Sequence, residues 1–257
     1  VPMVKVDPSD GIKEDLFGSS VSLLGDLLMV GATEADLGDR NDTGATYLFR
    51  IEANGSSTCL SKLTAHDGNE EDSFGTSVSQ SGDFFAIDAT RADMDDRNET
   101  GAAYVFHMET NDGTTFVAKA AAPAGSVGDG FGHSVSISNE FLSVGAPFSD
   151  EGEDGAVYLY RMEANGSVSH LTKLMAPDDT VGGNFGHSIS ESDDLLLIGA
   201  NKADVDDQGE AGKAYLYRIE TNGSATYLTR LTAPDGEEGD RFGQSLSQEG
   251  KFLAVGA

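Results

Sequence analysis

The first sixty residues alternate between apolar and polar positions in a way that predicts short β-strands. From residue 17 to 23, Phe17, Val21 and Leu23 fall on one face and serines on the other, which indicates a half-buried strand. A short turn leads to residues 27–32, a near-continuous apolar run that is typical of a strand buried on both faces. These two segments therefore predict the first half of a β-sheet.

Two further strands are predicted after an acidic loop. They span residues 45–52 and 58–65, with Asn54-Gly55 between them. This dipeptide is a strong hairpin signal because glycine and asparagine tolerate positive φ. Four strands in about 50–60 residues is the size of one propeller blade.

The same pattern recurs along the whole chain. Phe-Gly pairs follow one another at intervals of 57, 57, 54 and 57 residues, and a small pair, mostly Gly-Ala, comes fourteen residues after each Phe. The repeats start at Phe17, Phe74, Phe131, Phe185 and Phe242. We interpret residues 1–257 as one all-β region, a β-propeller of four-stranded antiparallel blades with five units visible.

The most complete unit, FGHSVSISNEFLSVGAP, spans residues 131–147 and carries Phe-Gly followed by Gly-Ala-Pro. In this the chain resembles the FG-GAP repeats, the blades of the integrin α-subunit head, over nearly its whole length. The resemblance implies a β-propeller, usually of about seven blades, with extracellular adhesion or ligand-binding roles. It also implies that the five units are part of a larger propeller or of an assembly.

One feature departs from the integrin pattern. Integrin-type blades often carry a DxDxDG calcium loop between their first two strands, whereas the segments here are tight turns that begin at Ser81, Ser138 and Ser192. That calcium site cannot be transferred. With the lead-in LTAPDGEEGDRFG at residues 231–243, the units are more similar to the short FG-GAP repeats of microbial and algal secreted proteins.

The strand count leaves the closure of the ring open. Residues 2–6 resemble the fourth strand of a unit, and the chain ends after the second strand of the fifth. A ring closed from these parts would lack one strand and expose sheet edges. We therefore expect either further blades in a longer protein or head-to-tail contacts between molecules, which form filaments when they do not close.

Charge excludes some partners. The chain has 16 basic and 44 acidic residues, a net charge of −28, and so negative a surface repels nucleic acid and anionic membranes. No apolar run is long enough to insert into a membrane. The single cysteine, Cys59, permits no disulfide within the chain.

The acids recur in two loops of each unit. Calcium takes six to eight oxygen ligands, and the loop between the second and third strands offers carboxylates at Asp36, Asp39, Asp42, Asp93, Asp95, Asp96, Glu99, Asp204, Asp206, Asp207 and Glu210. A second set lies seven and two residues before the Phe of most units, as at Asp67 and Asp72. We predict calcium in the first loop. The alternative is that both loops are solvated acidic turns, in which Asp caps backbone N–H groups.

The repeats provide an internal test for catalysis, because a catalytic residue should be unique and a structural one should recur. All five histidines and Cys59 occupy positions that other residue types fill in other units; His133 and His187, for example, stand where Ser19 and Thr76 stand. No nucleophile–base arrangement, phosphate loop or zinc spacing is present. The sequence predicts that the chain is not an enzyme.

Five N-x-[ST] sequons are present, at Asn41, Asn54, Asn98, Asn165 and Asn222. Three of them share one position between the third and fourth strands, where the asparagine could simply form the turn. A glycan requires a secreted, eukaryotic-type route.

Together these features predict an extracellular or cell-surface adhesion or structural glycoprotein, a non-catalytic scaffold that binds other proteins, extracellular matrix or glycans, and that could self-assemble as a protomer of a surface fibre. Two alternatives stay open. One is a lectin-like propeller with carbohydrate pockets between blades, and the other is an accessory propeller of a larger secreted hydrolase.

Overall fold

The computed structural model describes residues 5–8, 10–93, 99–123, 128–138, 140–149, 154–178 and 182–257. Nearly all regular structure in these residues is β-strand, and the one helix there is the short 3₁₀ segment η1 (Lys13–Asp15). None of the described helical structure is long and apolar enough to span a membrane.

The strands form successive antiparallel sheets in which neighbours in sequence are neighbours in space. The first sheet contains β1 (Phe17–Leu24), β2 (Leu27–Ala32), β3 (Ala45–Ile51) and β4 (Ser57–Leu63). The second contains β5 (Phe74–Ser81), β6 (Phe84–Ala89), β7 (Ala102–Met108) and β8 (Thr114–Ala120). The third contains β9 (Ser134–Ser138), β10 (Phe141–Ala146), β11 (Ala156–Met162) and β12 (Val168–Leu174). The fourth contains β13 (Phe185–Ser192), β14 (Leu195–Ala200), β15 (Lys213–Ile219) and β16 (Ala225–Leu231), and a final hairpin pairs β17 (Ser245–Glu249) with β18 (Phe252–Gly256).

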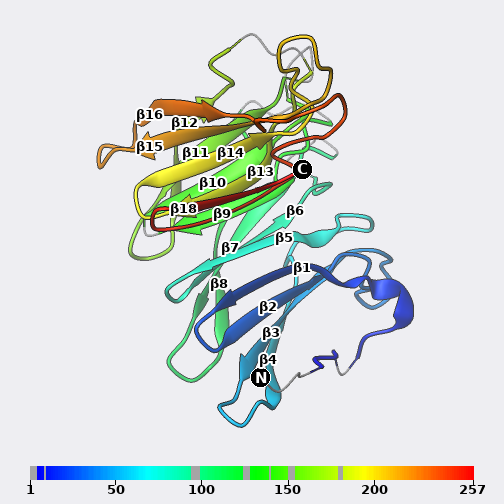
Figure 1. Cartoon of the computed structure of the whole chain (residues 1–257). Helices are drawn as coiled ribbons and strands as arrows, with labels where there is room; N and C mark the ends of the chain where they lie inside the picture. Colours follow the sequence, from blue (N-terminus) through cyan, green and yellow to red (C-terminus); the bar gives the residue numbers. More distant parts are fainter. Residues whose placement is uncertain are drawn as a thin grey trace.

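The sheets stack face to face as the blades of a propeller (Figure 1). Their first strands, β1, β5, β9, β13 and β17, contact one another in succession along the inner side, and the fourth strands lie outermost. The all-β fold with five repeat units is therefore confirmed. We call the end of the strands that carries the Phe-Gly segments and the loops between second and third strands the loop end, and the opposite end the hairpin end.

Two details of the sequence prediction are wrong. Val21 and Leu23 are 64% and 65% exposed rather than half-buried, because none of the described strands packs on the face of β1 that points away from β5. The equivalent Val78 and Val135 are covered and only 9% and 5% exposed. In the predicted strand at residues 2–6, the described residues Lys5 and Val6 form no strand. Val6 instead packs on the hydrophobic cluster of the first blade, and the rest of that segment lies outside the described residues.

The turns explain how each blade is compact. Two-residue turns join the first two strands of the first, second, fourth and fifth units, and their first residue has positive φ, as in Gly25 and Gly82. These described turns are too short for an integrin-type loop, as the sequence predicted. The hairpin between β3 and β4 differs from the prediction, because only Gly55 has positive φ. Asn54 acts through its side chain instead, since its Oδ1 accepts hydrogen bonds from the Ser56 backbone N–H and hydroxyl, each at 2.8 Å.

Glycines of the repeat meet across the blade boundaries. A Cβ atom placed on Gly31 would lie 2.1 Å from the carbonyl oxygen of Gly75 in the next blade, and one on Gly199 would lie 2.2 Å from that of Gly243. The hydroxyl of Ser20 donates to the same Gly75 oxygen at 2.7 Å. The glycine of the Gly-Ala pair and the glycine of the Phe-Gly pair are therefore required by the same contact, in which the backbone of one blade touches the backbone of the next.

Candidate functional site

The acidic loops at the loop end are organised by backbone capping. Asp36 Oδ1 accepts a hydrogen bond of 3.1 Å from the Asp42 N–H, six residues further on. The same contact occurs between Asp93 and Glu99 at 3.0 Å, and between Asp204 and Glu210 at 2.9 Å. The first carboxylate of each of these loops therefore acts as a cap, which is how aspartate stabilises turns without a metal.

No three carboxylate, histidine or cysteine side chains come together as a metal site in the part of the chain that the structure describes. Asp39, Asp206 and Asp207 thus join no such group, and Glu210 forms a 3.0 Å ion pair with Arg241. The predicted ligands Asp95 and Asp96, and the sequon Asn98, lie outside the described residues. Calcium in these loops stays a prediction.

The second set of acids stabilises the blades through direct partners. Asp10 accepts hydrogen bonds from the Tyr47 hydroxyl at 2.9 Å and from Lys62 at 2.8 Å. The same arrangement joins Asp67 to a tyrosine and a lysine, and Asp178 to a tyrosine, a lysine and an arginine. At Asp178 the hydrogen bonds outweigh burial and lower the pKa to about 2.

The acids closest to each Phe-Gly pair cap tight turns. The carboxylates of Asp15, Asp72 and Asp240 each accept a hydrogen bond from the backbone N–H three residues earlier, at 2.7–3.0 Å. These acids of the second set therefore have hydrogen-bonding partners within the protein.

The repeated tyrosine and arginine of the third strand of each blade have structural partners. Tyr47, Tyr104 and Tyr215 are fully buried. The guanidinium of Arg50 binds both carboxylate oxygens of Asp112 at the hairpin tip of the next blade, at 2.6 and 2.9 Å. Arg161 donates to the Thr221 carbonyl of the following hairpin at 2.8 Å. The guanidinium groups of Arg50 and Arg161 therefore link one blade to the hairpin of the next.

His133 and His187 pack against each other with ring centroids 4.8 Å apart. Burial lowers the pKa of both, that of His187 to about 4, so the two imidazoles are neutral at pH 7. Neither imidazole forms a hydrogen bond or an ion pair with a carboxylate of the described residues.

The four described sequon asparagines are exposed. Asn54, Asn165 and Asn222 form the same side-chain turn at the hairpin end, each accepting hydrogen bonds from the serine two residues on. Asn41 lies in the first acidic loop, at the loop end.

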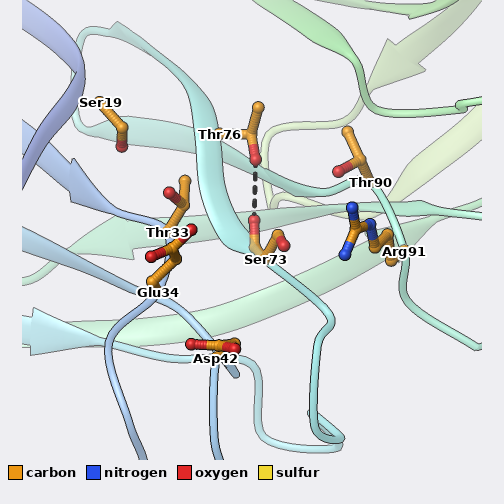
Figure 2. Close-up of a pocket in the computed structure, with 8 residues that line it drawn as sticks. All are labelled: Ser19, Thr33, Glu34, Asp42, Ser73, Thr76, Thr90 and Arg91. Atoms are coloured by element: carbon orange, nitrogen blue, oxygen red, sulfur yellow. Dashed lines mark hydrogen bonds between the residues drawn. The ribbon is translucent and has the colours of Figure 1, made fainter. Parts of the chain in front are cut away.

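A polar cavity of about 330 Å³ opens at the loop end between the first and second blades. Figure 2 shows Thr33 and Glu34 on one side, Thr90 and Arg91 on the other, and Ser73 and Thr76 between them. Ser19 and Asp42 complete the lining. We call this set of eight residues the Arg91 groove. Its volume is at the lower end of the roughly 300–1,000 Å³ that ligand pockets occupy.

A second cavity, of about 230 Å³, lies over the second and third blades. It is lined by Glu99, His133, Phe148 and two glycines, and it shares Thr90 and Arg91 with the first. Arg91 therefore stands between two adjoining cavities. It follows directly after β6, so the end of that strand positions it at the boundary between blades.

Arg91 is exposed, and its guanidinium makes no hydrogen bond or ion pair within the described part of the chain. The sequence analysis did not identify this residue. An alignment of the repeats could have identified it, because one position holds a different residue in each of the four blades: Glu34, Arg91, Phe148 and Lys202. That position varies in charge and shape, whereas the alanine two residues before it is the same in all four blades.

The family of the chain follows from its repeats. The sequence model of the FG-GAP repeat matches residues 2–49, 58–106, 114–160, 168–217 and 226–257. The chain belongs to the FG-GAP repeat family. The matched segments 58–106, 114–160 and 168–217 each begin in the outer strand of one sheet and end in the third strand of the next, so the FG-GAP sequence unit is offset by one strand from the blade.

No individual curated protein matches the chain. The FG-GAP repeats fit an extracellular adhesion or binding propeller.

Proposed function

We propose that this FG-GAP chain is an extracellular, non-catalytic adhesion module that binds its ligand at the Arg91 groove. The observation that carries the proposal is a polar cavity at a blade boundary whose one guanidinium has no partner among the described residues. Binding sites in rigid scaffolds commonly lie on loops that the scaffold positions, and the groove is formed by such loops at the loop end.

The groove supports binding rather than catalysis. The Thr76 hydroxyl donates to the Ser73 carbonyl at 3.0 Å, and the Ser73 hydroxyl donates to the Glu71 carbonyl at 3.3 Å. Neither hydroxyl is hydrogen-bonded to a base that could activate it as a nucleophile. No histidine or cysteine lines the groove.

The sequons support a glycoprotein on geometric grounds. Three of the described sequon asparagines are exposed at hairpin tips, at the end of the strands opposite to the groove. Glycans there would leave the groove open. We expect mass spectrometry of the protein from its own source to find glycans at Asn54, Asn165 and Asn222, and unmodified peptides would contradict this part of the proposal.

Binding is tested with the immobilised chain and a panel of matrix proteins and glycans, measured by surface plasmon resonance in calcium and in EDTA. We expect at least one ligand to bind, and Arg91→Ala to weaken its binding. Lys251→Ala is the matched control, because Lys251 is also exposed and lies in a two-residue turn at the hairpin end. Absence of binding across the panel, or binding that Arg91→Ala leaves intact, would overturn the proposal.

Calcium is tested by thermal unfolding. If ions bind the folded state only, EDTA should lower the Tm by several degrees, because binding to the native state alone adds to its stability. An unchanged Tm would contradict calcium stabilisation and leave backbone capping as the only role of Asp36, Asp93 and Asp204.

A fibre protomer is a second candidate, and one observation favours it. β1 presents Val21, Leu23 and Leu24 at 64%, 65% and 44% exposure, on positions that another blade covers elsewhere in the chain. Sedimentation velocity over a range of concentrations tests it. Association that Val21→Lys abolishes would support a fibre contact, and a monomer at all concentrations would exclude one for this chain.

A further inference from the structure

We propose that the Arg91 groove binds an acidic saccharide, a sugar carrying a carboxylate or sulfate group, with Arg91 holding the anionic group and the opposite wall holding the sugar hydroxyls. This inference rests on the proposed binding function and names the class of its ligand.

Arg91 differs from the other arginines of the chain. Each of the other described arginines has a partner within the protein, namely Arg40, Arg50, Arg161, Arg218, Arg230 and Arg241. In a chain with a net charge of −28, an arginine without an acidic partner is available to a ligand. Its planar fork of N–H donors matches a carboxylate or sulfate in a bidentate manner.

The other residues of the groove favour a ligand that carries hydroxyl groups over a small inorganic anion. Five hydroxyl side chains line it, those of Ser19, Thr33, Ser73, Thr76 and Thr90. Hydroxyls both donate and accept hydrogen bonds, which suits a ligand rich in hydroxyl groups.

The carboxylates of Glu34 and Asp42 decide between a sugar and a peptide. They lie away from Arg91 in the groove (Figure 2) and form no ion pair with it or with any other described residue. A carboxylate accepts hydrogen bonds and cannot donate them when ionised. Sugar hydroxyls satisfy these acceptors. The side chains of poly-glutamate carry carboxylates and no hydroxyl groups, so they offer Glu34 and Asp42 no donor to offset the repulsion between carboxylates.

The adjoining cavity extends the site beyond one sugar. It continues from Arg91 to Phe148, whose side chain is 40% exposed and packs edge-on against His133. An exposed aromatic face gives the apolar side of a sugar ring a surface to pack on. We therefore expect an oligosaccharide to bind more tightly than its monosaccharide unit.

The test is isothermal titration calorimetry with the full 257-residue chain and four probes. They are oligogalacturonate, a sulfated carrageenan oligosaccharide, a neutral cello-oligosaccharide and poly-glutamate. We expect binding of one or both acidic saccharides, weakened by salt because the contact is charged, and little binding of the neutral sugar or the peptide. The two acidic probes distinguish a carboxylate ligand from a sulfate ligand.

Variants locate the contact. Arg91→Ala should weaken acidic-saccharide binding about tenfold or more, as expected for loss of a charged hydrogen-bonded pair. Arg91→Lys should recover part of the affinity, because it keeps the charge and loses the fork. Lys251→Ala should bind as the parent does. Equal thermal unfolding of the variants would show that the effect is local, since the Arg91 guanidinium has no partner among the described residues.

Three outcomes would overturn the inference. These are absence of acidic-saccharide binding, binding unchanged in Arg91→Ala, and poly-glutamate binding as tight as that of the saccharides. Arg91-dependent binding of a matrix protein without saccharide binding would remove the inference and keep the proposed function. Absence of every ligand from the panel would remove both.

Discussion

The boundary between the second and third blades is built differently from the boundary between the third and fourth. At the latter, a Cβ on Gly145 would lie 2.1 Å from the Gly186 carbonyl oxygen, and the Ser134 hydroxyl donates to that oxygen at 2.8 Å. At the former, Asp88 takes the glycine position, and its Oδ1 accepts the Ser77 N–H at 2.5 Å. The repeat therefore accepts a side chain at this position where its carboxylate makes a hydrogen bond in place of the backbone contact.

The spacing supports that conclusion. A Cβ on Gly132, which faces Asp88, would lie 3.3 Å from the Asp88 Cβ, so the two backbones are separated by a side chain rather than in contact. The Ser77 hydroxyl no longer crosses to a glycine carbonyl and instead accepts the Val135 N–H at 3.0 Å. One substitution has thus exchanged a backbone contact for a different set of hydrogen bonds.

Both boundaries also contain a buried acid. Asp88 is fully buried, its Oδ2 has no partner among the described residues, and burial raises its pKa well above the ordinary value. Glu191 accepts the Ser143 hydroxyl across the next boundary, and burial raises its pKa to about 8. Both carboxyls are favoured in their neutral form, which is the usual response of a carboxyl removed from water.

Adding a methyl group at the close boundary should have the largest effect. Gly145→Ala places a Cβ against the Gly186 carbonyl, and overpacking of this kind costs about 1–3 kcal/mol or more. We expect the Tm to fall by roughly 5–10 °C, measured by differential scanning calorimetry. Gly25→Ala is not a suitable control because Gly25 has positive φ; Gly209, with only one atom within 4 Å of its Cβ position and no positive φ, is. A Gly145→Ala Tm within the range of Gly209→Ala would refute the close contact.

Replacing Glu191 at the same boundary by glutamine should raise stability at alkaline pH, where the parent carboxyl has to ionise. The folded-state pKa of Glu191, about 8, exceeds its ordinary value of 4.5. Its contribution to stability is therefore complete below pH 4.5 and is lost as the pH rises through 8. Glu191→Gln should match the parent at pH 4 and have a Tm several degrees higher at pH 8. A Tm difference that does not change between these pH values would contradict the assigned burial.

The second boundary offers the same test at a second buried carboxyl. Asp88→Asn keeps the size and the acceptor for the Ser77 N–H but cannot ionise. Because the folded-state pKa of Asp88 is raised, the parent loses stability as the pH rises above the ordinary range of an aspartate. We expect Asp88→Asn to gain stability over the parent with rising pH, read from chemical denaturation at several pH values. A parallel pH profile in both proteins would show that Asp88 is solvated.

The smallest effect is expected at the outer rim of a boundary. Asp112 binds Arg50 across the first two blades and has a φ of 65°. Asp112→Gly removes an exposed ion pair, worth about 0–1 kcal/mol, and at the same time relieves the strained backbone. The Tm should change by no more than about 2 °C. A large loss would mean that the rim, rather than the inner glycine contact, holds the blades together.

Much of the fold could be predicted from the sequence because the repeat is local. The four strands of the first blade were predicted to within one or two residues, since each strand pattern is bounded by turn residues such as Gly25 and Gly55. The exposure of Val21 could not be predicted. A strand's period shows which residues share a face, but it does not show whether another sheet covers that face.

The candidate site was harder to predict, because its residues are not a motif. Carboxylates such as Asp36 and Asp10 were candidate ligands because they recur from unit to unit. In the structure Asp36 accepts a backbone N–H, and Asp10 accepts hydrogen bonds from two side chains. Arg91 does not recur. It becomes a site residue only because two blades place serine and threonine hydroxyls beside it, while its guanidinium pairs with none of the described acids.

The sequence by itself determined the strands, the turns, the blade unit and the family of this protein, because these depend on periodicity and on residues within one repeat. Only the tertiary structure decided which polar groups are satisfied internally and which are free. The partners of Arg50, Asp178 and Glu191 lie about 30 to 60 residues away or in the next blade. That the Arg91 guanidinium pairs with none of the described residues is therefore visible only when neighbouring blades are in contact.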